Sequence, residues 1–311
     1  MQTRRIGELK VSTVGLGCNN FGRLMDETAV QQVVAAAVEA GINLFDTADI
    51  YGSGQSEVLL GKALGPRRKH VHIASKFGFN QARGGGAKAY VRQACDASLM
   101  RLNTEYIDLL YFHRPDPATP IAETLDAMLQ LKQAGKVREI ACSNFSTTQL
   151  HEAQASGLGQ GFVAVQNEYS LLERSPEQGL LDLCSTQKVA FVPYFPLKSG
   201  LLTGKYRPGR LPQSGRLTSA KGGVFEGMAK SLLTDTNLAL VEHLAHFAEE
   251  RGHTLLDLAF SWLLMRPQVA SVIAGATKPA QVVGNVAAAA WELSAADMAQ
   301  VDSILSRPAH P

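Results

Sequence analysis

The sequence alternates short runs of apolar, often β-branched residues with longer amphipathic stretches, and this alternation constrains the fold more than any other feature. The pattern predicts eight strands that each precede a helix. The predicted strands span residues 11–17, 42–45, 71–75, 107–112, 137–142, 162–165, 189–192 and 270–274. Eight such units with mostly apolar strands are typical of the α/β class, and in particular of a closed parallel (β/α)8 TIM barrel.

Helix signals follow these strands, with acidic or Ser/Thr starts and Gly stops. The predicted helices span 26–40, 56–64, 87–102, 120–133, 146–155, 176–184, 235–251, 254–265, 279–290 and 294–306. The segment 196–221 is too long for an ordinary loop, and loops of this length are usually functional. No Pro/Ser-rich linker divides the chain, which predicts one domain over residues 1–311.

Composition and charge argue against several classes of protein. Thirty Lys and Arg against 28 Asp and Glu leave a net charge of +2, without the basic footprint of a nucleic-acid binder. The first ten residues lack the apolar core of a signal peptide, and the most apolar stretch, 255–265, is interrupted by Asp257 and Ser261. Widely spaced cysteines suit reduced thiols; they are Cys18, Cys95, Cys142 and Cys184. We expect a cytoplasmic protein that binds neither membrane nor nucleic acid.

Polar and aromatic residues follow nearly every predicted strand. They are Asn19, Asp46, Lys76, His113, Asn144, Gln166, Tyr194 and Thr277. In a parallel barrel the active site lies at the carboxyl ends of the strands. The sequence therefore predicts that these side chains surround one pocket.

Four residues, Asp46, Tyr51, Lys76 and His113, suggest acid–base chemistry. A tyrosine hydroxyl titrates near ~10, and a nearby ammonium lowers that pKa. A carboxylate would hold the lysine charged, and a histidine can donate a hydrogen bond to a substrate oxygen. Each residue alone could be a turn cap, turn packing, a solvated charge or a core histidine. Their joint occurrence at separate strands favours a tuned proton donor that needs no metal.

The sequence resembles the aldo-keto reductase family over nearly its whole length, most closely the bacterial and potassium-channel-β-like branch. The matching segments are 41–52 (GINLFDTADIYG), 75–76 (SK), 106–109 (YIDL), 113–116 (HRPD), 143–145 (SNF), 166–169 (QNEY), 200–206 (GLLTGKY) and 275–279 (GATKP). The resemblance implies a (β/α)8 TIM barrel with an N-terminal β-hairpin and extra C-terminal helices.

It also implies an NADP-dependent aldehyde reductase, an oxidoreductase that interconverts the carbonyl and alcohol of an aldehyde, ketone or sugar. Tyr51 would be the general acid/base, tuned by Lys76 and Asp46, and His113 would orient the carbonyl. The resemblance assigns cofactor contacts to Cys18, Asn19, Asp46, Ser143, Asn144, Gln166, Tyr194, Pro196, Leu197, Gly200, Leu202, Lys205, Arg216, Gly275, Thr277, Lys278, Gln281 and Asn285.

These contacts divide along the dinucleotide. The resemblance places residues 143, 144 and 166 at the nicotinamide carboxamide, Tyr194 on its ring, and 196–202 with Lys205 at the pyrophosphate. Lys278 and Arg216 near a ribose 2′-phosphate would favour NADP(H), with NAD(H) as the alternative. Gly284 stands where the family often carries Glu, so one contact at the adenine end departs from the pattern.

Two other functions fit parts of the sequence. A Schiff-base aldolase would use Lys76 as nucleophile, but it needs a neutral amine, which Asp46 opposes. A catalytically weak nicotinamide-binding regulatory subunit fits the channel-β resemblance, whereas His113 favours catalysis because such subunits tend to have another residue there. The substrate, the direction of the reaction and the oligomeric state stay open.

Overall fold

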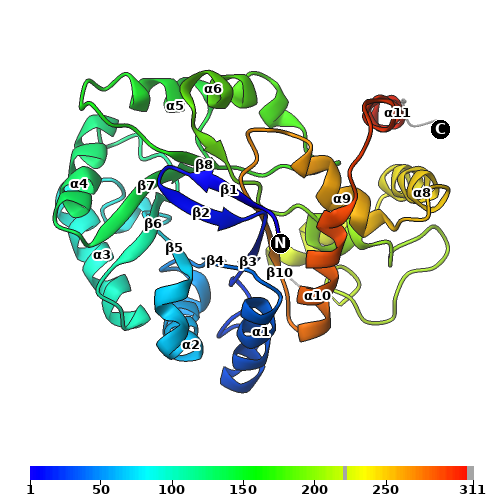
Figure 1. Cartoon of the computed structure of the whole chain (residues 1–311), viewed down its shortest axis with the longest axis horizontal. Coiled ribbons are helices and arrows are strands. Elements are labelled where there is room, and N and C mark those ends of the chain that lie inside the picture. The colour runs from blue at the N-terminus through cyan, green and yellow to red at the C-terminus, as the bar shows by residue number, and fades with distance from the viewer. Residues whose placement is uncertain (220–222, 307–311) are drawn as a thin grey trace.

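A computed structural model of the chain describes residues 1–219 and 223–306. Eight parallel strands form one sheet in the order β10-β3-β4-β5-β6-β7-β8-β9. Their bounds are Val14–Gly17 (β3), Leu44–Asp46 (β4), His72–Phe77 (β5), Ile107–Phe112 (β6), Val137–Ser143 (β7), Ala164–Gln166 (β8), Ala190–Phe191 (β9) and Val272–Gly275 (β10). Phe191 accepts from the Ala270 amide at 2.9 Å and donates to the Gln268 carbonyl at 2.8 Å. These hydrogen bonds join β9 to the segment just before β10 and so close the ring of strands. Figure 1 shows the strands around the centre of the molecule.

Helices surround the barrel (Figure 1). The α-helices are Glu27–Glu39 (α1), Gln55–Leu64 (α2), Lys88–Leu102 (α3), Ile121–Gln133 (α4), Thr147–Gln154 (α5), Leu180–Gln187 (α6), Gly223–Leu232 (α7), Asp235–Glu249 (α8), Leu255–Leu264 (α9), Pro279–Ala287 (α10) and Ala295–Leu305 (α11). Short 3-10 helices are Tyr51–Gly54 (η1), Gly65–His70 (η2), Gln81–Arg83 (η3), Ser175–Glu177 (η4), Lys198–Thr203 (η5) and Ala288–Ala290 (η6). Reciprocal capping boxes begin α5, α9 and α11 at Ser146, Thr254 and Ser294.

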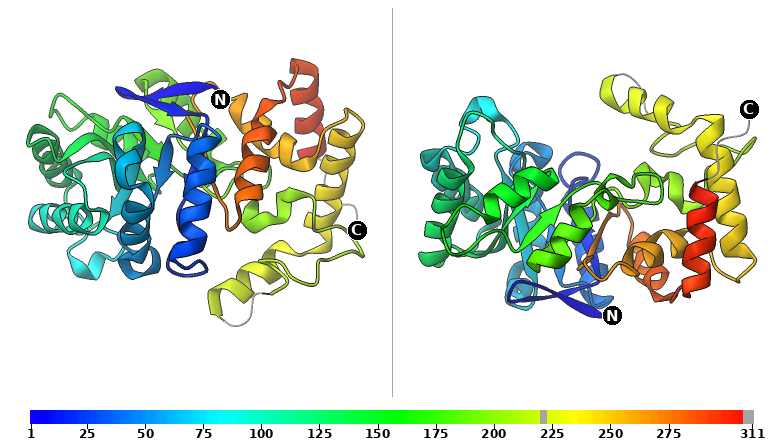
Figure 2. Two further views of the ribbon diagram at one scale, coloured as in Figure 1. Left: turned by 60° about the horizontal axis from the view of Figure 1, so that its bottom comes forward. Right: turned by 90° about the horizontal axis from the view of Figure 1, so that it is seen from above.

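An antiparallel hairpin of β1 (Thr3–Ile6) and β2 (Leu9–Ser12) precedes the barrel. Its apolar side chains Ile6, Leu9 and Val11 pack inside the barrel with residues that include Leu44 and Leu109. The hairpin therefore closes one end, while the segment around α7 lies at the opposite end (Figure 2). The predicted barrel, hairpin and C-terminal helices are confirmed.

Three differences from the sequence prediction are the clearest. The predicted strand 11–17 is two strands, because the chain leaves the hairpin at Thr13 and enters the barrel at Val14. The predicted helix 176–184 is η4 followed by α6, with Gly179 between them in a left-handed conformation at φ 93°. Helix α7 was not predicted, since its segment carries two glycines and no capping signal. Lys221, the end of the predicted long segment, lies outside the described residues.

The long segment after β9 is ordered against the barrel. Tyr206 is fully buried and its hydroxyl accepts the Leu217 amide at 3.1 Å. Arg207 pairs with Glu242 and Glu249 of α8. The segment thus has a fixed course beside the open end of the barrel, as its predicted functional role requires.

Candidate active site

Strand periodicity explains why polar side chains meet at one end of the barrel. Successive strand residues point to opposite faces, so the residue two positions after an inward apolar residue also points inward. Leu44, Ala74, Tyr111, Ala141 and Ala164 form the interior cluster of the barrel. The inward positions that follow them are Asp46, Lys76, His113, Ser143 and Gln166. Each strand therefore changes from apolar to polar at its carboxyl end, where the hairpin does not fill the barrel.

Asp46, Lys76 and Tyr51 form a hydrogen-bonded set. The Lys76 Nζ atom donates to Asp46 Oδ1 at 2.5 Å, to the Thr47 carbonyl at 3.0 Å and to the Tyr51 hydroxyl at 3.3 Å. Lys76 is 1% exposed and Asp46 3% exposed. The second Asp46 oxygen accepts from Gln166 Nε2 at 2.8 Å, so both carboxylate oxygens have partners. A buried ammonium therefore lies between a fixed carboxylate and a phenol.

The chain turns sharply to present Tyr51. Gly52 has φ 55°, and a Cβ atom there would lie 2.9 Å from the Phe21 carbonyl oxygen, so glycine is required. Below the turn, the Ser56 hydroxyl donates to the Cys18 carbonyl at 2.8 Å and lies 2.8 Å from the Thr47 hydroxyl. These contacts fix the segment that carries Tyr51 to β3 and β4.

Burial decides the protonation states of this set. Burial raises the pKa of Tyr51, and the attraction of Lys76 only partly offsets this. The sequence predicts that the Lys76 ammonium lowers the pKa of Tyr51. That prediction is wrong in its net direction, because burial raises this pKa by more than Lys76 lowers it. Burial acts to lower the pKa of Lys76, but Asp46 and Tyr51 outweigh it and the net pKa is raised. At neutral pH Tyr51 is therefore a neutral phenol and Lys76 an ammonium.

His113 directly follows β6, the strand that pairs with β5. Its ring packs edge-on to Tyr51 with centroids 6.1 Å apart and to Phe79 with centroids 5.0 Å apart. Burial, with the charges of Lys76 and Arg114, lowers its pKa to about 2. The imidazole is therefore neutral over the physiological range, and one ring nitrogen carries a hydrogen.

A cavity of about 940 Å³ opens beside these residues. Most of the predicted site residues line it: Asn19, Asp46, Tyr51, His113, Ser143, Asn144, Gln166, Tyr194, Pro196, Leu197, Gly200, Lys205, Arg216, Gly275, Thr277, Gln281 and Asn285. The volume is in the range of cofactor sites, about 300–1,000 Å³. Residues from all parts of the chain therefore converge on one elongated space.

Hydrogen bonds order the wall next to His113. Asn144, in a left-handed conformation at φ 61°, donates to the His113 carbonyl at 2.9 Å and accepts from the Tyr194 hydroxyl at 2.7 Å. The Ser143 hydroxyl donates to the Gln166 carbonyl at 2.7 Å. This network holds an aromatic ring and several amide groups at the edge of the cavity.

Two cations line the far part of the cavity. Lys205 lies close to Gly200, where an added Cβ atom would be 3.2 Å from the Lys205 Nζ atom. Arg216 hydrogen-bonds Asn20. Burial lowers the pKa of both groups, and Arg216 lowers that of Lys205 further. Among the described residues neither forms an ion pair. Adjacent cations without carboxylates are suited to phosphate groups, as a dinucleotide would supply.

The first turn of α10 forms the end of the cavity. Gln281 Oε1 accepts from the Thr277 amide at 2.7 Å and the Lys278 amide at 3.2 Å. Asn285 and Gly284 also line this end. Gly284 leaves the space that a larger side chain would fill, consistent with its departure from the family pattern.

Four predicted site residues do not line the cavity. Cys18 and Leu202 are fully buried beneath its wall, and Lys278 lies exposed at the start of α10. Lys76 is buried and contacts two residues that do line the cavity, Asp46 and Tyr51. Conversely, the wall includes Leu24, Phe79, Arg114 and Leu256, to which the sequence assigned no role. Arg114 directly follows His113 at the end of a predicted strand, and that position could have identified it as a residue of the cavity wall. Leu256 lies on α9, where no position in the sequence pattern indicates that it faces the cavity.

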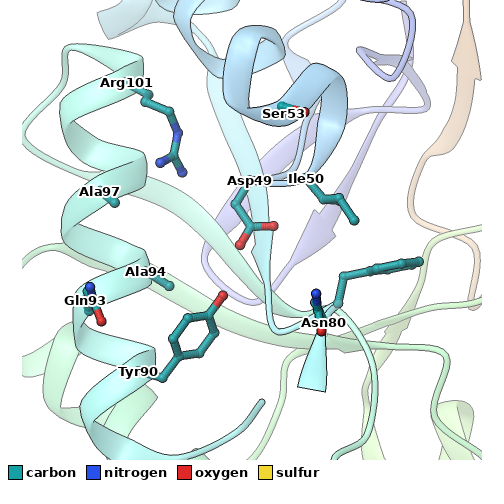
Figure 3. Close-up of a pocket in the computed structure, with 10 residues that line it drawn as sticks. Asp49, Ile50, Ser53, Asn80, Tyr90, Gln93, Ala94, Ala97 and Arg101 are labelled. Carbon is teal, nitrogen blue, oxygen red and sulfur yellow. The ribbon is translucent and has the colours of Figure 1, made fainter. Parts of the chain in front are cut away.

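A second cavity of about 460 Å³ lies behind the Tyr51 segment. Asp49, Ile50 and Ser53 line it on one side, and Tyr90 and Arg101 of α3 on the other (Figure 3). Phe79 lines both this cavity and the larger one. A single aromatic ring thus contributes to the partition between two spaces.

Two further features concern the described residues as a whole. No helix in residues 1–219 or 223–306 is long and apolar enough to cross a bilayer. Within the same ranges, no three His, Cys, Asp or Glu side chains are grouped as metal ligands would be.

The fold and the site define a barrel enzyme with its chemistry at the open end. The aldo/keto reductase family model matches residues 13–306. The chain belongs to this family, and it is an NAD(P)-dependent oxidoreductase that acts on carbonyl or alcohol groups.

Individual relatives agree with this assignment. A probable voltage-gated potassium channel subunit beta from Arabidopsis thaliana is 34% identical over 301 residues, which cover 93% of this chain and 91% of that protein. An L-glyceraldehyde 3-phosphate reductase from Escherichia coli O157:H7 is 32% identical over 324 residues, covering 97% and 92%. The solved structure of a glycerol dehydrogenase from Gluconobacter oxydans matches with a TM-score of 0.82 and 29% identity, covering 99% of this chain and 98% of that one. The resemblance to both the bacterial and the channel-β branches is confirmed.

Proposed function

We propose that this chain reduces the carbonyl group of an aldehyde, ketone or sugar with NADP(H), and that Tyr51 supplies the proton. The observation that supports this most is the distance of 3.3 Å from the Lys76 Nζ atom to the Tyr51 hydroxyl, with Asp46 at 2.5 Å on the other side of the ammonium. Tyr51 lines a cavity that has room for both a dinucleotide and a small substrate.

The reduced nicotinamide, when bound, supplies a hydride to the carbonyl carbon. The Tyr51 hydroxyl gives its proton to the carbonyl oxygen, so that the phenol becomes a phenolate and the substrate an alcohol. The Lys76 ammonium stabilises the phenolate, and Asp46 keeps Lys76 charged and in place. Neutral His113 donates a hydrogen bond to the same carbonyl oxygen and sets its direction.

The residues for the cofactor divide by chemistry. We assign the amide and hydroxyl groups of Ser143, Asn144 and Gln166 to the carboxamide and the Tyr194 ring to the nicotinamide face. Lys205 with the 196–202 segment is assigned to the pyrophosphate, and Arg216 to a ribose 2′-phosphate, because these cations have no carboxylate partner among the described residues.

Tyr51→Phe tests the proposed mechanism. The phenyl ring keeps the packing and removes the acidic hydrogen, so turnover of a small aldehyde should fall by about 10²–10⁴-fold. NADPH binding, measured by fluorescence titration, should be unchanged. Wild-type turnover in this variant would show that Tyr51 is not the acid.

Arg216→Gln tests the cofactor preference. If Arg216 contacts the 2′-phosphate, loss of a charged hydrogen bond should weaken NADPH binding by about tenfold or more and leave NADH binding nearly unchanged. If the binding of NADPH and NADH were weakened equally, Arg216 would not contact the 2′-phosphate. NAD(H) would then remain an alternative cofactor. Fluorescence titration of each cofactor gives both constants.

The aldolase alternative receives no support from the protonation state of Lys76. Its pKa is raised through Asp46 and Tyr51, so the amine is charged and a poor nucleophile. Trapping of a carbonyl compound on Lys76 with borohydride would favour the aldolase instead. The regulatory alternative predicts tight NADPH binding with negligible turnover of any aldehyde. The wild-type measurements made alongside Tyr51→Phe test both points.

The cellular compartment of the protein is also a proposal. All four cysteines are buried and free, as a reducing compartment favours, and we place the protein in the cytoplasm.

A further inference from the structure

Three cations line the large cavity, and the proposed function assigns a task to two of them. Lys205 and Arg216 belong to the segment proposed to bind the cofactor. Arg114 directly follows His113 at the end of β6, beside the proposed position of the carbonyl. An exposed guanidinium at the reacting end of the cavity therefore has no assigned partner.

Aromatic packing fixes the position of Arg114. Its guanidinium carbon lies 4.2 Å from the centroid of the Phe79 ring. The same ring lies edge-on to His113, with 5.0 Å between centroids. The Phe79 ring therefore lies between the Arg114 guanidinium and His113, which is proposed to face the substrate. The positive charge of Arg114 acts to lower the pKa of both His113 and Tyr194, which agrees with this proximity.

No acid in the described part of the chain pairs with Arg114. Asp46, the acid in the cavity wall, is bound to Lys76. Glu168 and Glu173, whose charges act on neighbouring Tyr194, both pair with Lys198. A guanidinium carries five N–H donors in a planar fork that matches an oxyanion. Within residues 1–219 and 223–306, the ion pairs therefore leave these donors available to an anion.

We propose that Arg114 binds a carboxylate or phosphate group at the non-reacting end of the substrate, so that the enzyme prefers aldehydes that carry an oxyanion. This inference rests on the proposed carbonyl reduction. It adds a substrate class, short anionic aldehydes, and names the residue that selects it. The apolar Leu24 in the same cavity suits the short carbon chain between the two groups.

Paired substrates test the proposal on the full-length enzyme with saturating NADPH. One pair is 4-carboxybenzaldehyde and 4-methylbenzaldehyde, and the other is glyceraldehyde 3-phosphate and glyceraldehyde. Arg114→Gln should lower the anionic-to-neutral ratio of kcat/KM by about tenfold or more in at least one pair, because a charge-assisted hydrogen bond is lost. Arg114→Lys should keep part of the preference. Arg67→Gln, an exposed control in η2 before β5, should leave both ratios unchanged.

The outcomes separate the two proposals. A loss in one pair only identifies the anion as carboxylate or phosphate. Equal ratios in the wild type and Arg114→Gln, with clear turnover of the neutral aldehydes, would overturn the role of Arg114 and leave carbonyl reduction intact. No turnover of any aldehyde by the wild type would overturn the proposed function itself.

Discussion

His113 couples the active site to the pH dependence of stability. Its pKa is about 2 in the folded chain against an ordinary value of 6.5. Below pH 6.5 the unfolded chain takes up a proton that the folded chain does not, so stability falls as the pH falls and is unaffected above. Between about pH 7.5 and 5.5 this should cost about 1.4 kcal/mol, which His113→Gln should abolish.

Urea denaturation of the two proteins at both pH values measures this difference. The same low pKa predicts no inflection near 6.5 in the pH profile of kcat/KM, since the imidazole stays neutral. An inflection there that disappears in His113→Gln would contradict a buried, neutral histidine.

Individual residues also show which part of the site could be predicted from sequence. Asp46, Lys76 and His113 follow apolar strands directly, and period two places them inward at the carboxyl end. The net rise in the pKa of Tyr51 could not be predicted, because it depends on how deeply the hydroxyl is buried rather than on which residues are near. Phe79 lies in a loop, where no periodicity indicates direction.

The contact between α2 and α3 depends on a glycine inside a helix. A Cβ atom on Gly61 would lie 2.2 Å from the Leu102 carbonyl oxygen. Gly61→Ala should therefore destabilise the protein by about 1–3 kcal/mol through overpacking, even though alanine favours the helix by about 1 kcal/mol. Thermal unfolding measures the change.

Gly227 in α7 provides the matched control. No described atom lies within 4 Å of its added Cβ, so Gly227→Ala should gain about 0.5–1 kcal/mol. If both substitutions were stabilising, the close approach of the two helices would not restrict residue 61.

Elements were predicted well where capping and periodicity agree. The capping boxes at Ser146, Thr254 and Ser294 begin helices whose starts the sequence predicts at the same residues. The break at Thr13 was missed because the hairpin strand and the barrel strand are both apolar, and only tertiary pairing separates them. Helix α7 was missed since it has no such boundary signal.

At the scale of the whole molecule, the hairpin fills one end of the barrel and leaves both cavities beside the other. The larger cavity holds the proposed catalytic residues, and the smaller one lies behind the same Tyr51 segment. Because Phe79 lines both, we expect its ring to limit the size of a substrate beside Tyr51.

Phe79→Ala should join the spaces of about 940 and 460 Å³. The kcat/KM for 2-naphthaldehyde relative to benzaldehyde should rise by about tenfold, in the range that pocket size usually contributes to discrimination. Phe79→Leu, which keeps most of the wall, should change this ratio much less. NADPH affinity should be the same in all three proteins, because Phe79 is not among the residues assigned to the cofactor. An unchanged ratio in Phe79→Ala would mean that the second cavity does not become available to the substrate.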